Sequence, residues 1–451
     1  MTMLLTPQDA RRLTDRLLSF AKADDAAVSV SSRIHTYLRF AANAPRTSGR
    51  AETFGATVTV WIERRRGSAS VSDLSDASLR MAVEEAETLA RISPVDREYL
   101  PTLGRQSYKP VDAYAEATAN LSLADRARSL DAAIAAAEKG GLVSAGFHQA
   151  EAVASAIATK NGNFLVERTS FASLGITART LEGGGSGFFL RSQVDVRRLD
   201  VARIAREAIR RAVESRSPRP VDPGVYRVIL EPQAVADIVS GGGLGFDART
   251  ADEGRSPFSA PGGKTRMGER IFDERISMLS DPWRPELPGS AYAPSGVPAQ
   301  VVTLVKDGVL ENLSYNRFWA QEKQRPPTPG PVNRIIEARG RTATVDEMIR
   351  QTDRGLLVTR FWYIRSVDAR TGLLTGLTRD GLWWIENGKV QHPVRNLRFN
   401  QSPIQMLAPG NVELIGASER VGPSENQGSG AMLAPALMLK AFTFTSVSDA
   451  V

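Results

Sequence analysis

The chain has 451 residues, 42% of them hydrophobic and 24% charged, a composition typical of a soluble globular protein with two domains. It contains no cysteine, which excludes disulfides, thiolate metal sites and cysteine nucleophiles. The net charge is +7, yet most arginines have acidic neighbours and the tight cluster Arg64-Arg65-Arg66 has no run of aromatic residues beside it. A solvated basic surface is therefore favoured over nucleic-acid binding.

The sequence also argues against a membrane location. Arginine and aspartate interrupt the apolar positions of the first 20 residues, which is not the pattern of a signal peptide. Near the C-terminus, Lys440 breaks the longest candidate for a membrane span. We therefore expect a cytoplasmic protein with no membrane partner.

The first half alternates helices and strands. Apolar residues at helical spacing predict helices over 9–22, 76–91 and 123–138, and a fourth helix that begins after the N-cap Asp200. Strands are predicted over 26–32, 36–42 and 54–62, and Asn161-Gly162 indicates a hairpin between 152–159 and 164–172. The glycine-rich run 183–187 is interpreted as a turn.

Residues 217–224 mark the predicted domain boundary. They contain three prolines and a glycine, which stop the preceding helix and cannot join a strand ladder. We predict an N-terminal domain over 1–216, a linker over 217–224 and a C-terminal domain over 225–451.

Strands dominate the second half after a short opening. A strand is predicted at 226–230 and a helix at 232–239, followed by the glycine-rich run 241–245. Asp307-Gly308 and Asn387-Gly388 each lie between apolar segments, the strongest short-range signal for a hairpin. Residues 324–331 are rich in proline and are predicted to form a loop.

A series of short motifs in residues 355–407 resembles the C-terminal domain of the TldD/PmbA (TldE) family of metalloprotease-like proteins. The pieces occur in the family's order: GLLVT at 355–359, VDARTG at 367–372, ENGK at 386–389, PV at 393–394 and ML at 406–407. Gly268-Glu269-Arg270, the segment 289–298 and AETFGA at 51–56 extend the resemblance. It implies an α+β fold, with an N-terminal domain of mixed sheet and helices before a strand-rich C-terminal domain.

The resemblance does not extend to the zinc ligands of the TldD-type members. Those members carry an H-E-x-x-x-H motif early in the C-terminal domain and a late cysteine. Here the three histidines are His35, His148 and His392, and Ser240, Gly241 and Gly245 stand where the motif belongs. We therefore assign no catalytic, cofactor-binding or metal-binding residue to this chain, which is more similar to the PmbA (TldE) branch.

Three other patterns allow competing interpretations. The run 241–245 could cradle a phosphate, but it lacks the required spacing and follows a helix, so a flexible loop or substrate-adjacent turn is favoured. His392 is interpreted as a surface or packed histidine. A carboxylate-based hydrolase would need the acidic residues of this region, which we interpret instead as a solvated rim: Glu231, Asp237, Asp247, Asp252 and Glu253.

The resemblance implies a subunit of a TldD/TldE-type zinc metallopeptidase complex that acts on unfolded or small peptides. This chain is expected to be the non-catalytic partner in a hetero-oligomer, with zinc and activity supplied by a TldD-like subunit. The competing hypothesis is a stand-alone peptide-binding or scaffold protein that has lost its enzymatic activity.

Two surfaces are relevant to these hypotheses. An exposed strand edge in the C-terminal domain could bind an extended peptide through main-chain hydrogen bonds. The apolar segment 431–444, interrupted by Pro435 and Lys440, is expected to be either a buried core strand or part of a subunit interface.

Overall fold

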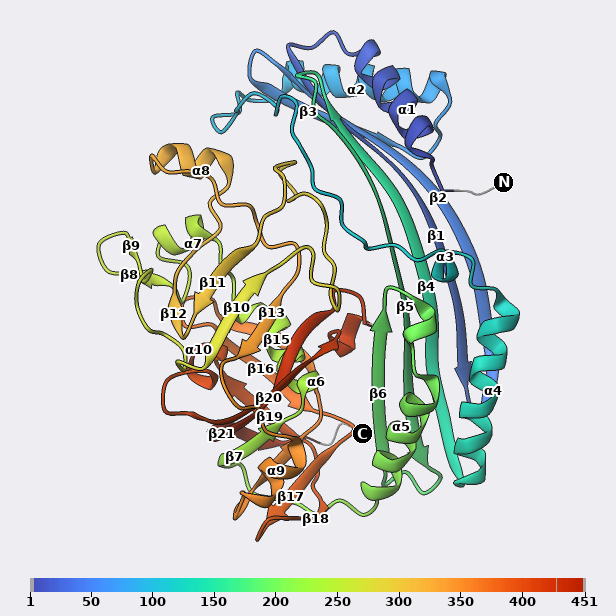
Figure 1. Cartoon of the computed structure of the whole chain (residues 1–451), viewed down its shortest axis with the longest axis vertical. Coiled ribbons are helices and arrows are strands. Elements are labelled where there is room, and N and C mark those ends of the chain that lie inside the picture. Colours follow the sequence, from blue (N-terminus) through green and yellow to red (C-terminus); the bar gives the residue numbers. More distant parts are fainter. Residues whose placement is uncertain (1–3, 427, 449–451) are drawn as a thin grey trace.

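The computed structural model describes residues 4–426 and 428–448, and it contains two large sheets with helices packed against them (Figure 1). The α+β class predicted from the sequence is confirmed. Within the described residues, no helix is long and apolar enough to cross a membrane.

The N-terminal half forms a six-stranded antiparallel sheet with the order β3-β2-β1-β4-β5-β6. Figure 1 shows these strands as one long, curved sheet. Its strands are β1 (Asp25–Ala41), β2 (Ala44–Ile62), β3 (Arg65–Val71), β4 (Leu142–Thr159), β5 (Phe164–Thr180) and β6 (Ser186–Gln193). A turn joins β5 to β6 as predicted, although residues 186 and 187 of the predicted turn already belong to β6, and the hairpin predicted at Asn161-Gly162 joins β4 to β5.

Strand β1 corrects one prediction. The sequence indicated two strands, 26–32 and 36–42, whereas a single strand pairs with β2 and β4 along nearly its whole length. Ser32, Ile34 and Thr36 are all buried, so the alternation keeps one phase through the expected break. Arg33 and His35 belong to the opposite face, and their polarity therefore does not interrupt the strand.

Helices cover one face of this sheet. Helices α1 (Pro7–Phe20) and α2 (Asp76–Ile92) pack on one end, and α4 (Leu123–Lys139) and α5 (Val201–Glu214) pack on the other. The short helices α3 (Glu116–Ala119) and η1 (Val196–Arg198) complete this half. Helix α1 begins two residues before the predicted start because Thr6, not a later residue, caps it; Asp200 caps α5 as predicted.

The C-terminal half is built on a second sheet of 13 strands. A two-stranded sheet, β8 (Ser259–Ala260) and β9 (Lys264–Thr265), lies apart from it. The strands of the large sheet are β7 (Gly224–Leu230), β10 (Ile276–Ser280), β11 (Val302–Lys306), β12 (Val309–Leu310), β13 (Ile335–Ala338), β14 (Arg354–Val358), β15 (Phe361–Asp368), β16 (Leu373–Thr378), β17 (Leu382–Glu386), β18 (Lys389–Pro393), β19 (Leu397–Gln401), β20 (Val412–Val421) and β21 (Met432–Val447).

Short helices connect these strands, and the predicted turns are confirmed. The helices are α6 (Pro232–Ile238), η2 (Val239–Gly243), α7 (Ala248–Asp252), α8 (Arg317–Glu322), α9 (Val345–Arg350), α10 (Pro403–Met406) and η3 (Ser424–Asn426). Asp307 and Gly308 join β11 to β12, and Asn387 and Gly388 join β17 to β18, all four with positive φ.

The apolar C-terminal segment is a core strand. Strand β21 pairs with β7, β13, β19 and β20, and its residues from Met432 to Leu439 are all buried. Pro435 is accommodated beside an irregularity in the register between β20 and β21, where its missing N–H is tolerated. Of the two alternatives stated for residues 431–444, the buried strand is confirmed for this part of the segment.

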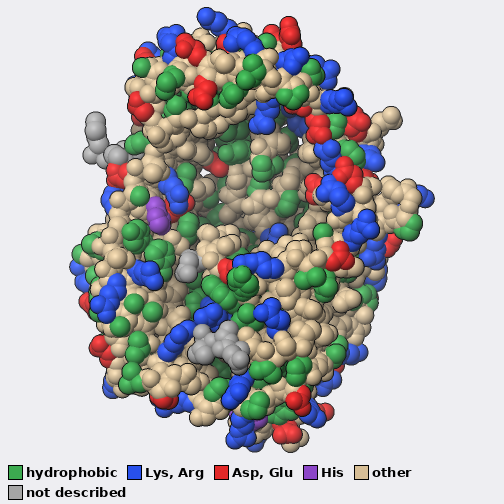
Figure 2. Space-filling view, turned by 180° about the vertical axis from the view of Figure 1, so that it is seen from behind, with side chains coloured by type: hydrophobic (Ala, Val, Ile, Leu, Met, Phe, Trp, Pro, Cys, Tyr) green, Lys and Arg blue, Asp and Glu red, His purple; other side chains and the backbone are tan. Residues whose placement is uncertain are grey.

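The two halves contact each other across a seam. Ser290 and the Ala291 N–H, from a C-terminal loop, both donate to the carboxylate of Glu167 on β5. Near the linker, Arg219 and Val394 form a parallel bridge. Further contacts cross the seam, including the ion pair of Arg191 with Glu419 and the hydrogen bond from Trp283 to the Pro110 carbonyl. Figure 2 shows a deep hollow on one face of the molecule.

Candidate functional site at the end of helix α6

Helix α6 starts in the middle of the second sheet, directly after β7, and all seven of its residues are buried. Pro232 occupies the first turn, where a helix needs no main-chain N–H. The helix then widens into the π-helical turn Val239–Gly243, within which Gly242 has a φ of 94°. Such turns often occur at functional sites, and this one contains Ser240 and Gly241.

The glycine turn is tightly packed, which corrects its interpretation as a flexible loop. A Cβ on Gly241 would lie 2.6 Å from Cγ2 of Ile364, and a Cβ on Gly243 would lie 2.6 Å from Cγ of Pro403. The glycines therefore let α6 approach β15 and α10 closely. Because the turn lies at the C-terminal end of α6, the helix dipole also disfavours a phosphate there.

A cavity of about 290 Å³ opens beside this turn. Three segments that are distant in the sequence form it: the end of α6 with its glycine turn, the start of β15, and the residues that follow β20. The lining residues are Asp237, Ser240, Gly241, Gly242, Phe361, Ile364, Pro423, Glu425 and Asn426.

Asp237 holds these three segments together. Its Oδ2 accepts a hydrogen bond from the Phe361 N–H (3.0 Å), and its Oδ1 accepts one from the Ser424 N–H (2.8 Å). Oδ1 also accepts from Nε2 of Gln233, at 3.0 Å. The side chain is almost fully buried, and burial raises the pKa of Asp237 to about 6 although these hydrogen bonds and Arg360 oppose the shift.

The other acidic residues of this region do not converge on the cavity. Glu231 pairs with Arg211 of α5, and Asp247 caps α7. Asp252 accepts a hydrogen bond from Trp319, and Glu253 pairs with arginines close to it in sequence. The interpretation of all five as a solvated rim is therefore wrong for the buried Asp237, and also for Glu231 and Asp252, whose side chains are only 16% and 9% exposed. Their burial depends on contacts that the sequence does not reveal.

The three histidines lie apart from this cavity. His35 and His148 are on opposite faces of the N-terminal sheet, where His35 contacts Gln149 and the pKa of the buried His148 is lowered to about 4 by burial and by Arg126. His392 lies on β18 and stacks on Trp384. None of them lines the cavity beside α6.

The residues around the cavity do not fit a zinc ion. Structural and catalytic zinc sites need three or four converging imidazole, thiolate or carboxylate ligands. Ser240, Gly241 and Gly245 offer none of these groups, and the oxygens of Asp237 already accept three N–H donors. Across residues 4–426 and 428–448, no group of three His, Asp or Glu side chains is placed to hold a metal.

A buried ion pair of the C-terminal half, formed by the residue before β15, lies against the N-terminal half, and it was not predicted from the sequence. Nη2 of Arg360 lies 2.9 Å from Oδ2 of Asp380, and its guanidinium lies 3.9 Å from the ring centre of Phe188 on β6. Arg360 interrupts an otherwise apolar stretch of the sequence. This interruption could have identified the buried arginine.

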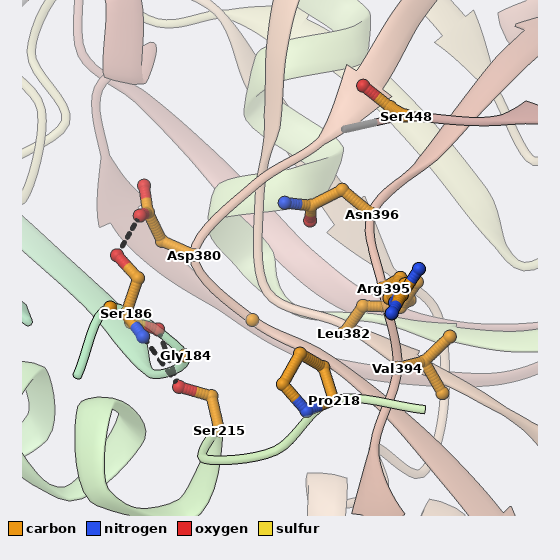
Figure 3. Close-up of a pocket in the computed structure, with 12 residues that line it drawn as sticks. Gly184, Ser186, Ser215, Pro218, Asp380, Leu382, Val394, Arg395, Asn396 and Ser448 are labelled. Atoms are coloured by element: carbon orange, nitrogen blue, oxygen red, sulfur yellow. Dashed lines mark hydrogen bonds between the residues drawn. The ribbon is translucent and has the colours of Figure 1, made fainter. Parts of the chain in front are cut away.

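Asp380 also lines a second cavity, of about 240 Å³, at the seam. Figure 3 shows Ser186 pointing towards Asp380, to which its hydroxyl donates, while Ser215 bonds to the main chain of Ser186. These contacts join the end of α5 and the start of β6 to the C-terminal sheet.

Comparison with known families matches most of the chain. Residues 26–90 match PmbA/TldA metallopeptidase domain 1, residues 110–216 match the central domain, and residues 223–446 match the C-terminal domain. The chain belongs to the PmbA/TldD metallopeptidase family. A metalloprotease from Methanothermobacter thermautotrophicus is 22% identical over 256 residues, which are 53% of this chain and 52% of that protein. The matched region thus spans about half the length of this relative.

Solved structures share the fold over nearly the whole chain. TldE from Thermococcus kodakarensis has a TM-score of 0.84 at 16% identity, covering 97% of this chain and 99% of that one. A protein described as a modulator of a DNA gyrase from Thermotoga maritima has a TM-score of 0.82 at 18% identity, with 96% and 100% covered. A Bacteroides thetaiotaomicron protein described in the same way has a TM-score of 0.82 at 18% identity, with 98% and 100% covered.

Proposed function

We propose that this chain is the non-catalytic, TldE-like subunit of a two-component zinc peptidase that acts on unfolded or small peptides in the cytoplasm. A TldD-like subunit supplies the zinc and the catalytic residues, and this chain supplies part of the wall around the substrate. The observation that carries the proposal is the cavity beside α6, next to the glycine turn where the resemblance places the zinc motif of TldD-type members. Its lining contains no histidine, and no group of three His, Asp or Glu side chains in the described residues is placed to hold a metal.

The chemistry of this cavity supports a structural role. Asp237 uses its carboxylate to hold α6, β15 and the segment after β20 in place, so it is not available as a metal ligand. Neither imidazole nor thiol is present to replace it. We expect a domain with such a cavity to form part of the wall around the substrate, while the TldD-like subunit supplies the metal.

Association with a zinc-bearing homologue tests this proposal. An affinity-tagged copy of this chain is co-expressed with a family member that carries H-E-x-x-x-H and a late cysteine, and the purified material is analysed by size-exclusion chromatography and elemental analysis. We expect one stable hetero-oligomer whose zinc is lost when the partner's motif is mutated. The tagged chain purified alone is expected to contain no stoichiometric zinc.

The competing function is a stand-alone peptide-binding or scaffold protein. Failure of the two chains to associate, together with peptide binding by this chain alone, would favour it. One tightly held zinc per isolated chain, lost on mutation of His35, His148 or His392, would contradict both assignments.

A further inference from the structure

A third cavity, of about 470 Å³, lies between helix α5 of the N-terminal half and the elements α9, β14, β17 and β18 of the C-terminal half. It shares no lining residue with the cavity beside α6 or with the cavity that Asp380 lines. Cavities of this size at the junction of two parts of a protein are common binding sites for small molecules.

The inner wall of this third cavity is apolar. Leu357 of β14 and Trp383 of β17 lie directly opposite each other in the sheet, so their side chains point to the same face. Val345 and Ile349 of α9 pack against them on that face. A ligand that fills the cavity therefore needs an apolar group to cover this wall.

The indole of Trp383 also brings a polar group into the wall. Trp383 is only 4% exposed, and its Nε1–H has no acceptor among the described residues. A buried N–H without an acceptor costs free energy, and an oxygen atom of a ligand would relieve this cost. The wall thus favours a ligand that carries a carbonyl group beside its apolar part.

The rim of the cavity is acidic. Three carboxylates line it, from Glu214, Glu231 and Asp346, together with one arginine, Arg210. Arg210 is already paired with Glu214, and Glu231 uses one oxygen, Oε2, to bind Arg211. Within the described part of the chain, Asp346 in the first turn of α9 has neither an ion pair nor a hydrogen bond. The rim therefore keeps negative charge that is not neutralised, and it favours a cationic group.

We propose that this cavity binds the amino-terminal residue of a small peptide or of an amino acid amide. The protonated α-amino group lies at the rim, beside Asp346 and Glu231. The apolar side chain covers Leu357 and Ile349, and the carbonyl oxygen accepts the N–H of Trp383. A free amino acid fits less well, because its carboxylate would lie close to the carboxylates of the rim. All the groups that bind the ligand belong to this chain, so the site does not depend on the proposed function.

Isothermal titration calorimetry of the isolated chain at pH 7, where the α-amino group is mostly protonated, tests the site with four related compounds. L-phenylalanine amide carries all three groups. Its N-acetyl derivative lacks the positive charge, 2-phenylethylamine lacks the carbonyl, and L-phenylalanine adds a carboxylate. We expect the amide to bind most tightly, the N-acetyl derivative at least about tenfold more weakly, and the other two compounds about three- to tenfold more weakly. Equal affinity of the amide and its N-acetyl derivative would overturn the proposal.

Substitutions assign the binding to this cavity. Asp346→Asn removes the unpaired charge at the rim, and we expect it to bind the amide about three- to tenfold more weakly. Asp353→Asn is the matched control, because it removes an exposed carboxylate that does not line the cavity and should leave the affinity unchanged. Trp383→Phe removes the N–H, so it should bind the amide and 2-phenylethylamine equally. Thermal melting establishes that each variant is folded, and the same two compounds on the wild type test this hydrogen bond if Trp383→Phe does not fold.

A tripeptide amide, L-phenylalanyl-glycyl-glycine amide, distinguishes the two sources of the ligand. Its binding would assign the site to the amino termini of peptides, whereas binding of the single-residue amide alone would assign it to small amides. No saturable binding of either compound to the wild type, or equal losses in Asp346→Asn and Asp353→Asn, would contradict the proposal. None of these measurements involves a zinc-bearing subunit, so their failure leaves the proposed function to its own test.

Discussion

Asp237 shows how one side chain can determine the character of a site. Two of its three hydrogen bonds join α6 to residues 124 and 187 positions later in the chain, and the third is to Gln233 in the same helix. A carboxylate in this environment is poorly solvated, and that is why its pKa rises. Because burial raises this pKa, the stability of the folded chain depends on pH.

The first prediction is a pH-dependent stability difference between the wild type and Asp237→Asn. Folding raises the pKa of Asp237 from 3.8 to about 6, so the stabilisation from this group is complete below about pH 4 and is lost as the pH rises through 6. The asparagine does not titrate. We expect the stability advantage of the wild type to fall by up to about 3 kcal/mol between pH 4 and pH 7.

Urea unfolding at several pH values between 4 and 7 measures this difference. Titration of His148 and of all other groups occurs in both proteins and cancels in the subtraction. A difference that is independent of pH, or one that grows as the pH rises, would show that the carboxylate of Asp237 is not held as described.

At the scale of elements, the glycine turn determines how α6 meets its neighbours. Gly241 and Gly243 lie in close contact with Ile364 and Pro403, and Gly242 has a backbone conformation that side chains resist. Gly245, two residues further on, has open space around it and an ordinary φ. The run thus contains both required and dispensable glycines.

The second prediction compares Gly243→Ala with Gly245→Ala. The new methyl group at residue 243 would press on Pro403 and on the Gly372 carbonyl, and we expect a loss of about 1–3 kcal/mol in the free energy of unfolding. The change at residue 245 is expected to stay within about 0.5 kcal/mol. Thermal and urea unfolding measure both; equal, small effects would mean that the run is only a spacer.

The elements also show what the sequence could and could not reveal. Helices α2, α4 and α5 and the Asn-Gly and Asp-Gly hairpins depend on signals within a few residues, and they were predicted closely. The continuity of β1 was missed because pairing with β2 and β4 supports residues that look polar locally. The cavity could not be foreseen, because Asp237, Phe361 and Ser424 meet only in the folded chain.

At the scale of the whole molecule, contacts at the seam hold the N-terminal and C-terminal halves together. The buried pair Arg360–Asp380 belongs to the C-terminal half, and Ser186 and Phe188 of β6 contact its two members across the seam. A buried pair is weak evidence of net stability, but removing one partner leaves an uncompensated charge. The seam therefore depends on both members of the pair.

The third prediction is that Asp380→Ala destabilises the protein by about 3–5 kcal/mol, because it leaves the guanidinium of Arg360 buried without its partner. Glu182→Ala, which breaks an exposed pair with Arg216, should change stability by less than about 1 kcal/mol. Urea unfolding of both variants gives the comparison. Similar small losses in the two variants would mean that the seam opens to water around Arg360.

The central claim, that this chain completes a peptidase whose zinc lies in another subunit, is tested most directly by reconstitution of activity. A fixed amount of the zinc-bearing homologue is titrated with this chain, and cleavage of an unfolded peptide is followed. We predict that neither chain cleaves the peptide alone and that activity rises to a plateau at a fixed ratio of the two. Full activity from the zinc-bearing chain by itself, unchanged by addition of this one, would contradict the claim.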